Sequence, residues 1–223
     1  MIKSNQSVID TVKAIEKEKL IVIVRGVERE KLLDFAEAAY RGGIRLLECT
    51  FDATGEVTDE QTADNIKMLI EHFGDKMLIG AGTVLSEKQV EFTAAVCGKF
   101  IISPDTNAAV IKKTKELGLV SIPGAFTPTE AVTAHTAGAD FVKLFPIAQM
   151  GARYIKDLKA PLSHIRFLAV GGVTAENMAE FFGAGACGFG VASDIANKSL
   201  IDAGDFAAIE ARARRYTEQI KKF

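Results

Sequence analysis

Lys143 is the residue whose surroundings most clearly suggest chemistry. It interrupts the apolar segment Phe141–Phe145, which is typical of a buried strand. Burial disfavours the charged form of an amine, and a partly neutral amine can attack a carbonyl carbon to form a Schiff base. A lysine at a strand end can instead extend its ammonium group to water, and this segment alone does not decide between the two interpretations.

A carboxylate occupies a comparable position in another apolar segment. Glu48 lies within residues 44–50, where strand alternation places it on the same side as Leu46 and Thr50. By the same alternation, Lys143 shares a side with Phe141. If both sides face the interior of a closed sheet, the two groups form either a structural ion pair or a general acid/base beside a nucleophilic amine.

Glycines near the end of the chain are a second signal. Gly171 and Gly172 follow one apolar segment, and Gly190 and Ser193 follow the next. Glycine allows an anion to approach the backbone closely, and the loops after the last two strands of a (β/α)8 barrel commonly bind phosphate. The pattern therefore favours a carbonyl compound that carries a phosphate.

The elements that must position these residues alternate along the whole chain. Continuous apolar strands joined by helices predict a parallel sheet covered by helices, and eight such units predict an α/β protein with a closed (β/α)8 TIM barrel. The expected strands are Leu20–Val24, Ile44–Thr50, Met77–Ala81, Phe100–Ser103, Leu119–Ile122, Phe141–Phe145, Ile165–Val170 and Cys187–Gly190. An additional amphipathic helix is expected at the N-terminus, and residues 1–223 are expected to form a single domain. A doubly wound open sheet is the alternative.

Composition excludes several classes of partner. The chain has 223 residues and a formal net charge of -2, so no strong overall field attracts nucleic acid or an anionic membrane. The first 20 residues lack the apolar core of a signal peptide, and we expect a cytoplasmic protein. The three cysteines are expected to be small buried residues and the three histidines to lie on the surface, so no metal site is predicted.

Several motifs, in this order, resemble the family of 2-keto-3-deoxy-6-phosphogluconate (KDPG) and 4-hydroxy-2-oxoglutarate (KHG) aldolases. They are Leu47-Glu48-Cys49-Thr50, Gly80-Ala81-Gly82-Thr83-Val84, Ile102-Ser103-Pro104, Ile122-Pro123-Gly124, Lys143-Leu144-Phe145-Pro146 and Gly171-Gly172-Val173. The resemblance covers nearly the whole chain from about Ile21. It implies a class I aldolase without metal or cofactor, usually a homotrimer, that cleaves a keto acid such as 2-dehydro-3-deoxy-6-phosphogluconate to pyruvate and glyceraldehyde 3-phosphate.

The resemblance also implies roles for individual residues. It assigns the Schiff base to Lys143 and proton transfer through a bound water to Glu48. It places Thr83, Pro104 and Phe145 in the substrate pocket. Gly171 and Gly172 would bind the phosphate, helped by Gly190 and Ser193.

Two positions depart from the usual pattern of the family. Asp52 stands where many relatives carry an arginine that grips the substrate carboxylate, and we expect Arg25 to take that role. Ala169-Val170 stands where the family often has Pro-Thr, which removes a hydroxyl near the substrate. Both changes bear on substrate identity more than on reaction type. The alternatives are a phosphosugar epimerase or isomerase on the same barrel, and a non-catalytic phosphosugar-binding protein.

Overall fold

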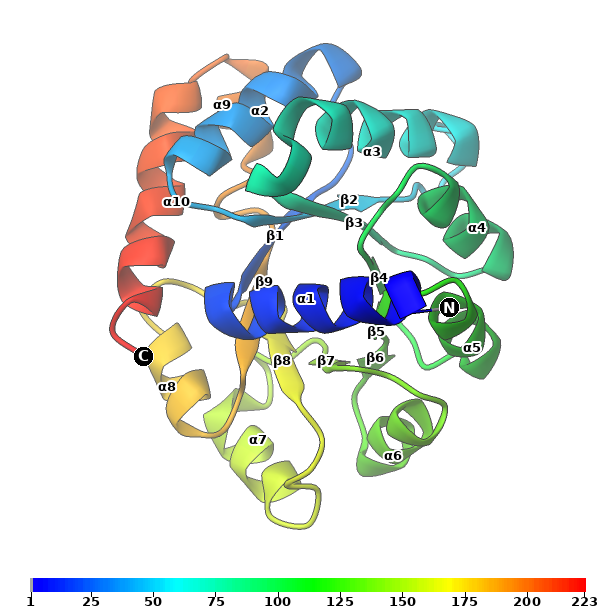
Figure 1. Ribbon diagram of the computed structural model, residues 1–223. Coiled ribbons are helices and arrows are strands. Elements are labelled where there is room, and N and C mark those ends of the chain that lie inside the picture. The colour runs from blue at the N-terminus through cyan, green and yellow to red at the C-terminus, as the bar shows by residue number, and fades with distance from the viewer. Residues whose placement is uncertain (1) are drawn as a thin grey trace.

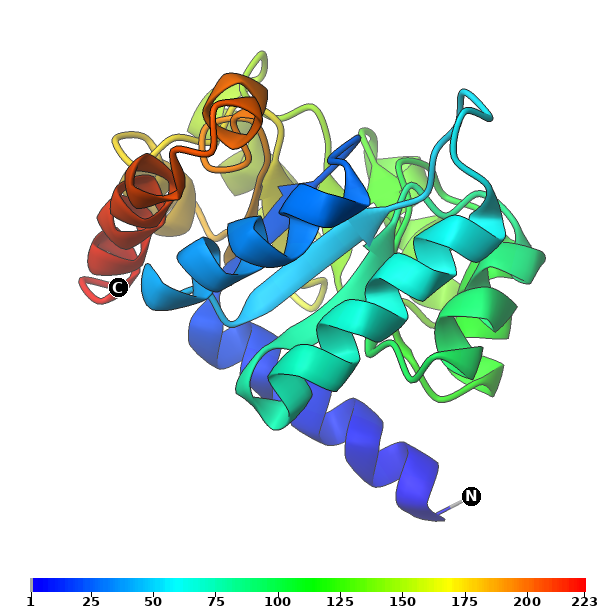
Figure 2. The same cartoon turned by 90° about the horizontal axis from the view of Figure 1, so that it is seen from above.

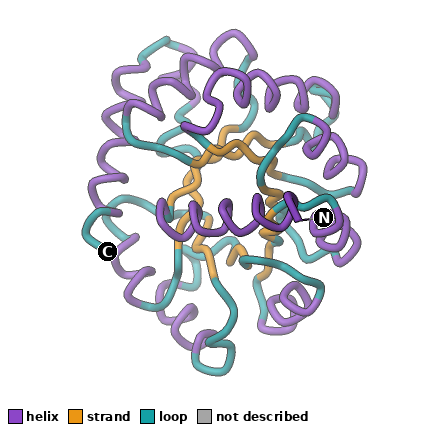
Figure 3. Tube along the Cα trace, viewed as in Figure 1, coloured by secondary structure: helices purple, strands orange, loops and turns teal. Residues whose placement is uncertain are grey.

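Parallel strands surround a central axis and helices surround the strands. The structure, a computed structural model, describes residues 2–223, which contain nine strand segments in the order β5-β4-β3-β2-β1-β9-β8-β7-β6. The segments are β1 (Leu20–Val24), β2 (Leu46–Thr50), β3 (Leu78–Gly82), β4 (Phe100–Ile102), β5 (Val120–Ile122), β6 (Gly124–Ala125), β7 (Val142–Leu144), β8 (Phe167–Val170) and β9 (Gly188–Val191). Figure 3 shows these strands as a ring inside the helices. The predicted α/β barrel is confirmed.

The ring closes through β5 and β6, which are two halves of one barrel strand. β5 pairs with β4, β6 pairs with β7, and Pro123 lies between the halves. Proline has no backbone N–H, but the Pro123 carbonyl still accepts a hydrogen bond of 2.9 Å from the Lys143 N–H. The eight predicted strands therefore appear as nine segments, and the short β6 was not predicted.

Helices cover the outside of the ring, except α1, which lies across one end. The helices are α1 (Ile2–Glu18), α2 (Arg29–Arg41), α3 (Asp59–Phe73), α4 (Glu87–Ala95), α5 (Ala108–Glu116), α6 (Pro128–Thr136), α7 (Gly151–Lys159), α8 (Met178–Gly183), α9 (Lys198–Asp202) and α10 (Phe206–Ile220), with a 3-10 turn at Gly74–Lys76. Thr127 begins α6 with a capping box to Glu130, and Pro128 supplies the fixed φ of the first helical position. The short α9 was not predicted, because five residues carry too little periodicity to reveal it.

The N-terminal helix differs from the others in its position. Helix α1 lies across one end of the strand ring, as Figures 1 and 2 show from two directions. Its buried Ile15 belongs to the apolar cluster inside the ring, and Val8 and Val12 pack against that cluster. The helix therefore closes the end of the barrel at which the strands begin.

The interior of the ring confirms the predicted sidedness of the strands. Leu46 and Phe141 belong to the inner apolar cluster, so the same faces of β2 and β7 carry Glu48 and Lys143 inward. The residues between them, Leu47 and Val142, belong to the outer cluster beneath the helices. The alternation of side chains along a strand was sufficient to predict this sidedness, because β2 and β7 each have one side in the inner cluster and the other in the outer cluster.

One prediction about the cysteines is wrong. Cys49 is buried and Cys187 is partly buried, but Cys97 is exposed. Cys97 follows the end of α4 with a φ of 67°, in a left-handed turn whose N–H bonds back to Ala94. Apolar neighbours suggested burial, whereas the turn at the helix end directs this side chain to the surface.

Candidate active site

A cavity of about 870 Å³ opens at the carboxyl ends of the strands. This is the end of a (β/α)8 barrel at which the chemistry of such proteins is located. Its lining includes most of the residues selected from the sequence, namely Arg25, Thr83, Pro104, Lys143, Phe145, Gly171, Gly172, Gly190 and Ser193. The structure therefore brings together side chains that are separated by up to 168 residues of sequence, from Arg25 to Ser193.

Lys143 lies at the bottom of this cavity. Strand β7 holds it between β6 and β8, and only 6% of its surface is exposed. Its Nζ lies 4.7 Å from the centre of the Phe145 ring, a distance at which an ammonium group interacts with the face of an aromatic ring. Desolvation, followed by the positive charge of Arg25, lowers the pKa of Lys143, while Glu48 acts in the opposite direction. The amine is thus biased toward its nucleophilic form.

Glu48 lies deeper, on the inner face of β2. It is 1% exposed, and its Oε2 has no hydrogen-bond partner among the residues that the structure describes. Burial raises the pKa of Glu48, and the positive charges of Lys143 and Arg25 oppose this shift. A raised pKa makes a carboxylate a stronger proton acceptor, which suits a group that must take up and return protons.

The glycine of β3 makes room for this carboxylate. A Cβ atom added to Gly82 would lie 1.6 Å from Glu48 Oε1, so any side chain at this position would displace the carboxylate. Gly82 pairs with Thr50 across the β2–β3 ladder, which holds the backbone of both strands at the ordinary spacing. The glycine of the Gly-Ala-Gly-Thr motif thus has a steric role in the site.

Glu48 and Lys143 also share a small inner space. Both line a cavity of about 10 Å³ whose other walls are apolar side chains and Gly190. This volume is close to the minimum that one water molecule requires, and the two polar groups could supply its hydrogen bonds. The space lies where a water could carry a proton between the carboxylate and the lysine.

Arg25 and Thr83 contact each other in the wall of the cavity that contains Lys143. Arg25 directly follows β1 and is exposed, and its Nη2 donates a 3.3 Å hydrogen bond to Thr83 Oγ1. Thr83 directly follows β3 with a φ of 55°, a left-handed conformation that is uncommon for a β-branched residue. The guanidinium group and the hydroxyl together form a polar corner that suits a carboxylate.

The loops after β8 and β9 place backbone groups in the cavity wall. Gly171 and Gly172 follow β8 with φ values of 91° and 78°, which only glycine adopts readily. A Cβ on Gly172 would lie 2.3 Å from the Cβ of Ala148, so this loop packs closely against the loop after β7. Gly190 lies on the inner face of β9, and the exposed Ser193 follows that strand.

Asp52 lines the cavity, but its carboxylate is hydrogen-bonded to its own loop. It accepts hydrogen bonds from the backbone N–H groups of Thr54 and Val57, both at 2.9 Å, and from the Thr54 hydroxyl. These bonds, led by the one from the Thr54 N–H, lower the pKa of Asp52 to about 2. Asp52, which stands where the resemblance leads one to expect an arginine, thus anchors a loop at the rim, and Arg25 is the cationic side chain beside Thr83.

Sequence reasoning missed several polar residues of the cavity wall. Thr62 and Asn65 reach it from α3, and Asp194 reaches it from the loop after β9. Helical periodicity marks which face of α3 is buried but does not show that part of this face borders a cavity. For Asp194, its place next to Ser193 was the available signal.

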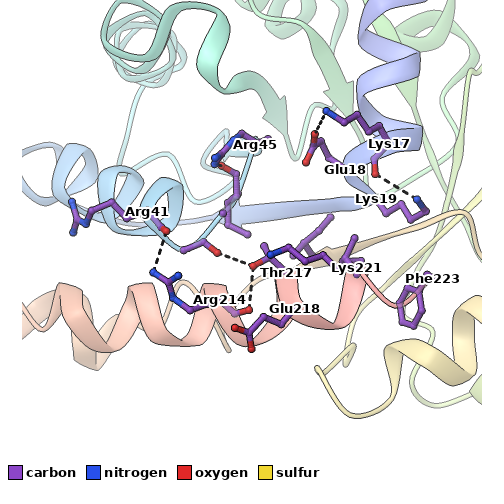
Figure 4. A pocket seen from close by; sticks show the side chains of 15 residues that line it. Lys17, Glu18, Lys19, Arg41, Arg45, Arg214, Thr217, Glu218, Lys221 and Phe223 are labelled. Atoms are coloured by element: carbon purple, nitrogen blue, oxygen red, sulfur yellow. Dashed lines mark hydrogen bonds and ion pairs between the residues drawn. The ribbon is translucent and has the colours of Figure 1, made fainter.

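Another cavity, of about 470 Å³, lies at the opposite end of the barrel (Figure 4). Its cationic residues are Lys17, Lys19, Arg41, Arg45, Arg214 and Lys221. Helices α1, α2 and α10 all end there, and cations are favourable near the partial negative charge of helix C-termini. Arg41 and Arg214 also pair with Glu210 at 2.8 and 2.7 Å. The helix ends and Glu210 thus offset part of the positive charge of this cavity.

Within residues 2–223, no group of three or more His, Cys, Asp and Glu side chains is arranged to hold a metal ion. The three histidines are exposed, as expected. No helix in the described part of the chain is long and apolar enough to cross a membrane.

Comparisons with known proteins identify relatives of this chain. A sequence model of the family described as KDPG and KHG aldolase matches residues 11–212. The 2-dehydro-3-deoxy-6-phosphogalactonate aldolase of Escherichia coli K12 is 39% identical over 178 residues, which are 78% of this chain and 87% of that protein.

Solved structures agree with the sequence comparisons. One described as native KDPGal is 35% identical, has a TM-score of 0.81, and is matched over 91% of this chain and 94% of its own. A KDPG aldolase from Legionella pneumophila, solved with pyruvate captured as a covalent carbinolamine, is 25% identical with a TM-score of 0.80. That match covers 91% of this chain and 96% of the Legionella chain.

Proposed function

This chain belongs to the KDPG and KHG aldolase family, and from that premise we propose that it cleaves a phosphorylated 2-keto-3-deoxy sugar acid through a Schiff base on Lys143. Membership in the family makes the protein an aldolase, a carbon–carbon lyase. The single observation that carries the assignment of residues is the buried pair of Lys143 and Glu48 on a shared inner space below the cavity.

The reaction begins at the amine. Neutral Lys143 Nζ attacks the C2 ketone and forms a carbinolamine, and loss of water gives an iminium ion. Removal of the proton from the C4 hydroxyl breaks the C3–C4 bond, and its electron pair moves toward the iminium nitrogen to give an enamine. An aldehyde leaves. Protonation of the enamine and hydrolysis of the imine release pyruvate and restore the lysine.

Glu48 is the group that moves protons in these steps. Its Oε2 has no other partner in the described structure, and burial raises its pKa, which makes the carboxylate a stronger proton acceptor. A water in the shared inner space would connect its carboxyl group to the carbinolamine hydroxyl and later to the C4 hydroxyl. This arrangement separates the nucleophile from the proton carrier, so neither must perform both tasks.

The two ends of the substrate would bind to different groups of the cavity wall. Arg25 can form a charge-assisted contact with the carboxylate, and Thr83 adds a hydroxyl beside it. Pro104 and Phe145 supply apolar walls between them. The N–H groups around Gly171, Gly172, Gly190 and Ser193 supply a site for the phosphate.

For the sugar acid, we favour 2-dehydro-3-deoxy-6-phosphogalactonate over the 6-phosphogluconate epimer that the motifs first suggested. Val170 projects from the inner face of β8 into the cavity and carries no hydroxyl with which to orient the C4 hydroxyl. The relative that is 39% identical acts on the galactonate substrate. The two epimers differ at C4, and both would yield pyruvate and glyceraldehyde 3-phosphate.

Trapping with borohydride tests the reaction. Wild-type protein incubated with pyruvate and borohydride should gain the mass of one reduced pyruvate, located on the peptide that contains Lys143. Lys143→Met should not be labelled, whereas Lys67→Met, which removes an exposed lysine, should be labelled as the wild type is. Persistent labelling of a folded Lys143→Met protein would show that another amine forms the Schiff base.

A comparison of epimers tests the substrate. We expect kcat/KM to be higher for 2-dehydro-3-deoxy-6-phosphogalactonate than for the gluconate epimer. Val170→Thr, which has nearly the same shape, should move this ratio toward the gluconate epimer by about tenfold, the scale of one hydrogen bond made in the transition state. Wild-type preference for the gluconate epimer would refute this substrate assignment and leave the reaction assignment intact.

A further inference from the structure

Helix α10 makes polar contacts to the loops after β8 and β9, which lie on the phosphate side of the cavity. Tyr216 of α10 is completely buried, and its hydroxyl lies 2.7 Å from Asp194 Oδ2 and 3.3 Å from the Val173 carbonyl. Asp194 directly follows Ser193, and Val173 directly follows Gly172. One phenol thus lies between the residues that adjoin each half of the proposed phosphate site.

The neighbouring arginine spans the same two loops. Arg215 donates to Asp194 Oδ2 at 3.0 Å, and its Nη1 lies 3.8 Å from Glu176 Oε1 in the loop after β8. Arg212, one turn earlier on α10, donates to the Asp194 carbonyl at 2.7 Å. Asp194 is therefore held by three side chains of a single helix, through both its carboxylate and its backbone.

These contacts fix the two loops to α10, and their donors do not face the proposed phosphate site. The Tyr216 hydroxyl has one hydrogen, and the shorter distance makes the Asp194 carboxylate its principal acceptor. Burial and the adjacent carboxylate also raise the pKa of Tyr216, so the phenol remains a donor through the neutral range. The arginines direct their donors to Asp194 and Glu176, not toward the glycines.

We propose that Tyr216 and Arg215 are positioning residues that hold the loops after β8 and β9 at a fixed separation and so set the affinity for the substrate phosphate. The inference rests on the proposed phosphate site. Because backbone N–H groups bind an anion only when they converge on it, a change in the separation of the loops weakens phosphate binding without touching Lys143 or Glu48.

The test compares a phosphorylated substrate with its unphosphorylated counterpart. Tyr216→Phe should raise KM for 2-dehydro-3-deoxy-6-phosphogalactonate by about tenfold, the scale of a lost hydrogen bond to a charged group, with kcat nearly unchanged. KM for 2-dehydro-3-deoxygalactonate should stay at the wild-type value. Inhibition by inorganic phosphate should weaken in parallel with the change in KM.

Arg215→Gln provides an independent variant, because Arg215 is half exposed and its replacement leaves the core intact. It should reproduce the KM effect, and Arg215→Lys should recover part of it, since a lysine can pair with one carboxylate but cannot span both. Tyr154→Phe and Arg153→Gln are matched controls. They remove a tyrosine hydroxyl and an arginine charge from α7, where the partners are Phe126 and Asp157, and should leave both substrates unaffected.

The possible outcomes distinguish a failure of the positioning role from a failure of the proposed phosphate site. If phosphate neither improves the substrate nor inhibits the wild type, the phosphate site itself is wrong and the inference is wrong with it. If the wild type depends on phosphate but both α10 variants keep that dependence, only the positioning role is overturned. Equal losses for phosphorylated and unphosphorylated substrates would indicate a general structural role and would also overturn it.

Discussion

Lys143 is subject to three influences that the structure separates. Burial and Arg25 both lower its pKa, and Glu48 raises it. At a given pH, the fraction of neutral amine therefore depends on two charged neighbours that can each be removed without changing the lysine. Because Glu48 raises the pKa of Lys143 and Arg25 lowers it, removing one charge or the other should shift this pKa in opposite directions.

We expect the two variants to move the pH profile of Schiff-base formation in opposite directions. The neutral amine is the nucleophile, so the rate of borohydride trapping at saturating pyruvate rises as pH passes through the pKa of Lys143. Glu48→Gln removes a charge that raises this pKa, so the rise should occur at lower pH than in the wild type. Arg25→Gln removes a charge that lowers it, so the rise should occur at higher pH.

Each profile is compared after scaling to its own plateau, because Glu48→Gln should also slow catalysis by about 10²- to 10⁴-fold as a lost general acid/base. Superimposable profiles would mean that neither charge reaches Lys143. A shift for Arg25→Gln alone would mean that Glu48 is already protonated in the range where the lysine titrates.

At the scale of elements, the two terminal helices have different tasks. Helix α10 packs beside the barrel and contacts the loops at the carboxyl ends of the strands, whereas α1 closes the other end. Ile15 of α1 is 1% exposed and belongs to the cluster inside the ring, while Ile9 of the same helix is 47% exposed. The helix thus offers a buried and an exposed isoleucine for direct comparison.

Ile15→Ala should lower the free energy of unfolding by about 2 to 5 kcal/mol, because it leaves a cavity at the closed end of the barrel. Ile9→Ala should change it by about 0.5 kcal/mol or less. Urea denaturation followed by circular dichroism measures both values. KM and kcat of the folded Ile15→Ala protein should match the wild type, and a large change in KM would contradict the separation between this helix and the site.

For the whole molecule, the barrel separates groups that stabilise the fold from groups that react. The inner apolar cluster reaches Ile15 of α1 at one end of the ring, and Lys143 and the glycine loops line the cavity at the other end. We propose that the chain folds as one domain, because α2, near the beginning of the sequence, contacts α10, near its end. Thr217 donates to the Gly42 carbonyl at 2.8 Å, and Arg41 pairs with Glu210.

Local patterns in the sequence were sufficient to predict the barrel and the shared side of each strand on which Glu48 and Lys143 lie, and the family motifs added Thr83, Pro104 and Phe145 of the cavity wall. Strand alternation is a property of the backbone, and short apolar strands between helices have few other ways to be buried. The family motifs, which are short and contiguous, then predicted the chemistry.

Tertiary structure alone decided the contacts between residues distant in sequence. The sequence could not show that the Asp52 carboxylate is hydrogen-bonded to its own loop or that Gly82 leaves space for Glu48. It also could not show that the Tyr216 hydroxyl lies between Asp194 and Val173. Each of these contacts depends on the positions that the side chains take once the ring has closed and the helices have packed. A distance of a few ångströms between such groups has no local signature, because the chain segments that set it fold against each other only in the complete barrel.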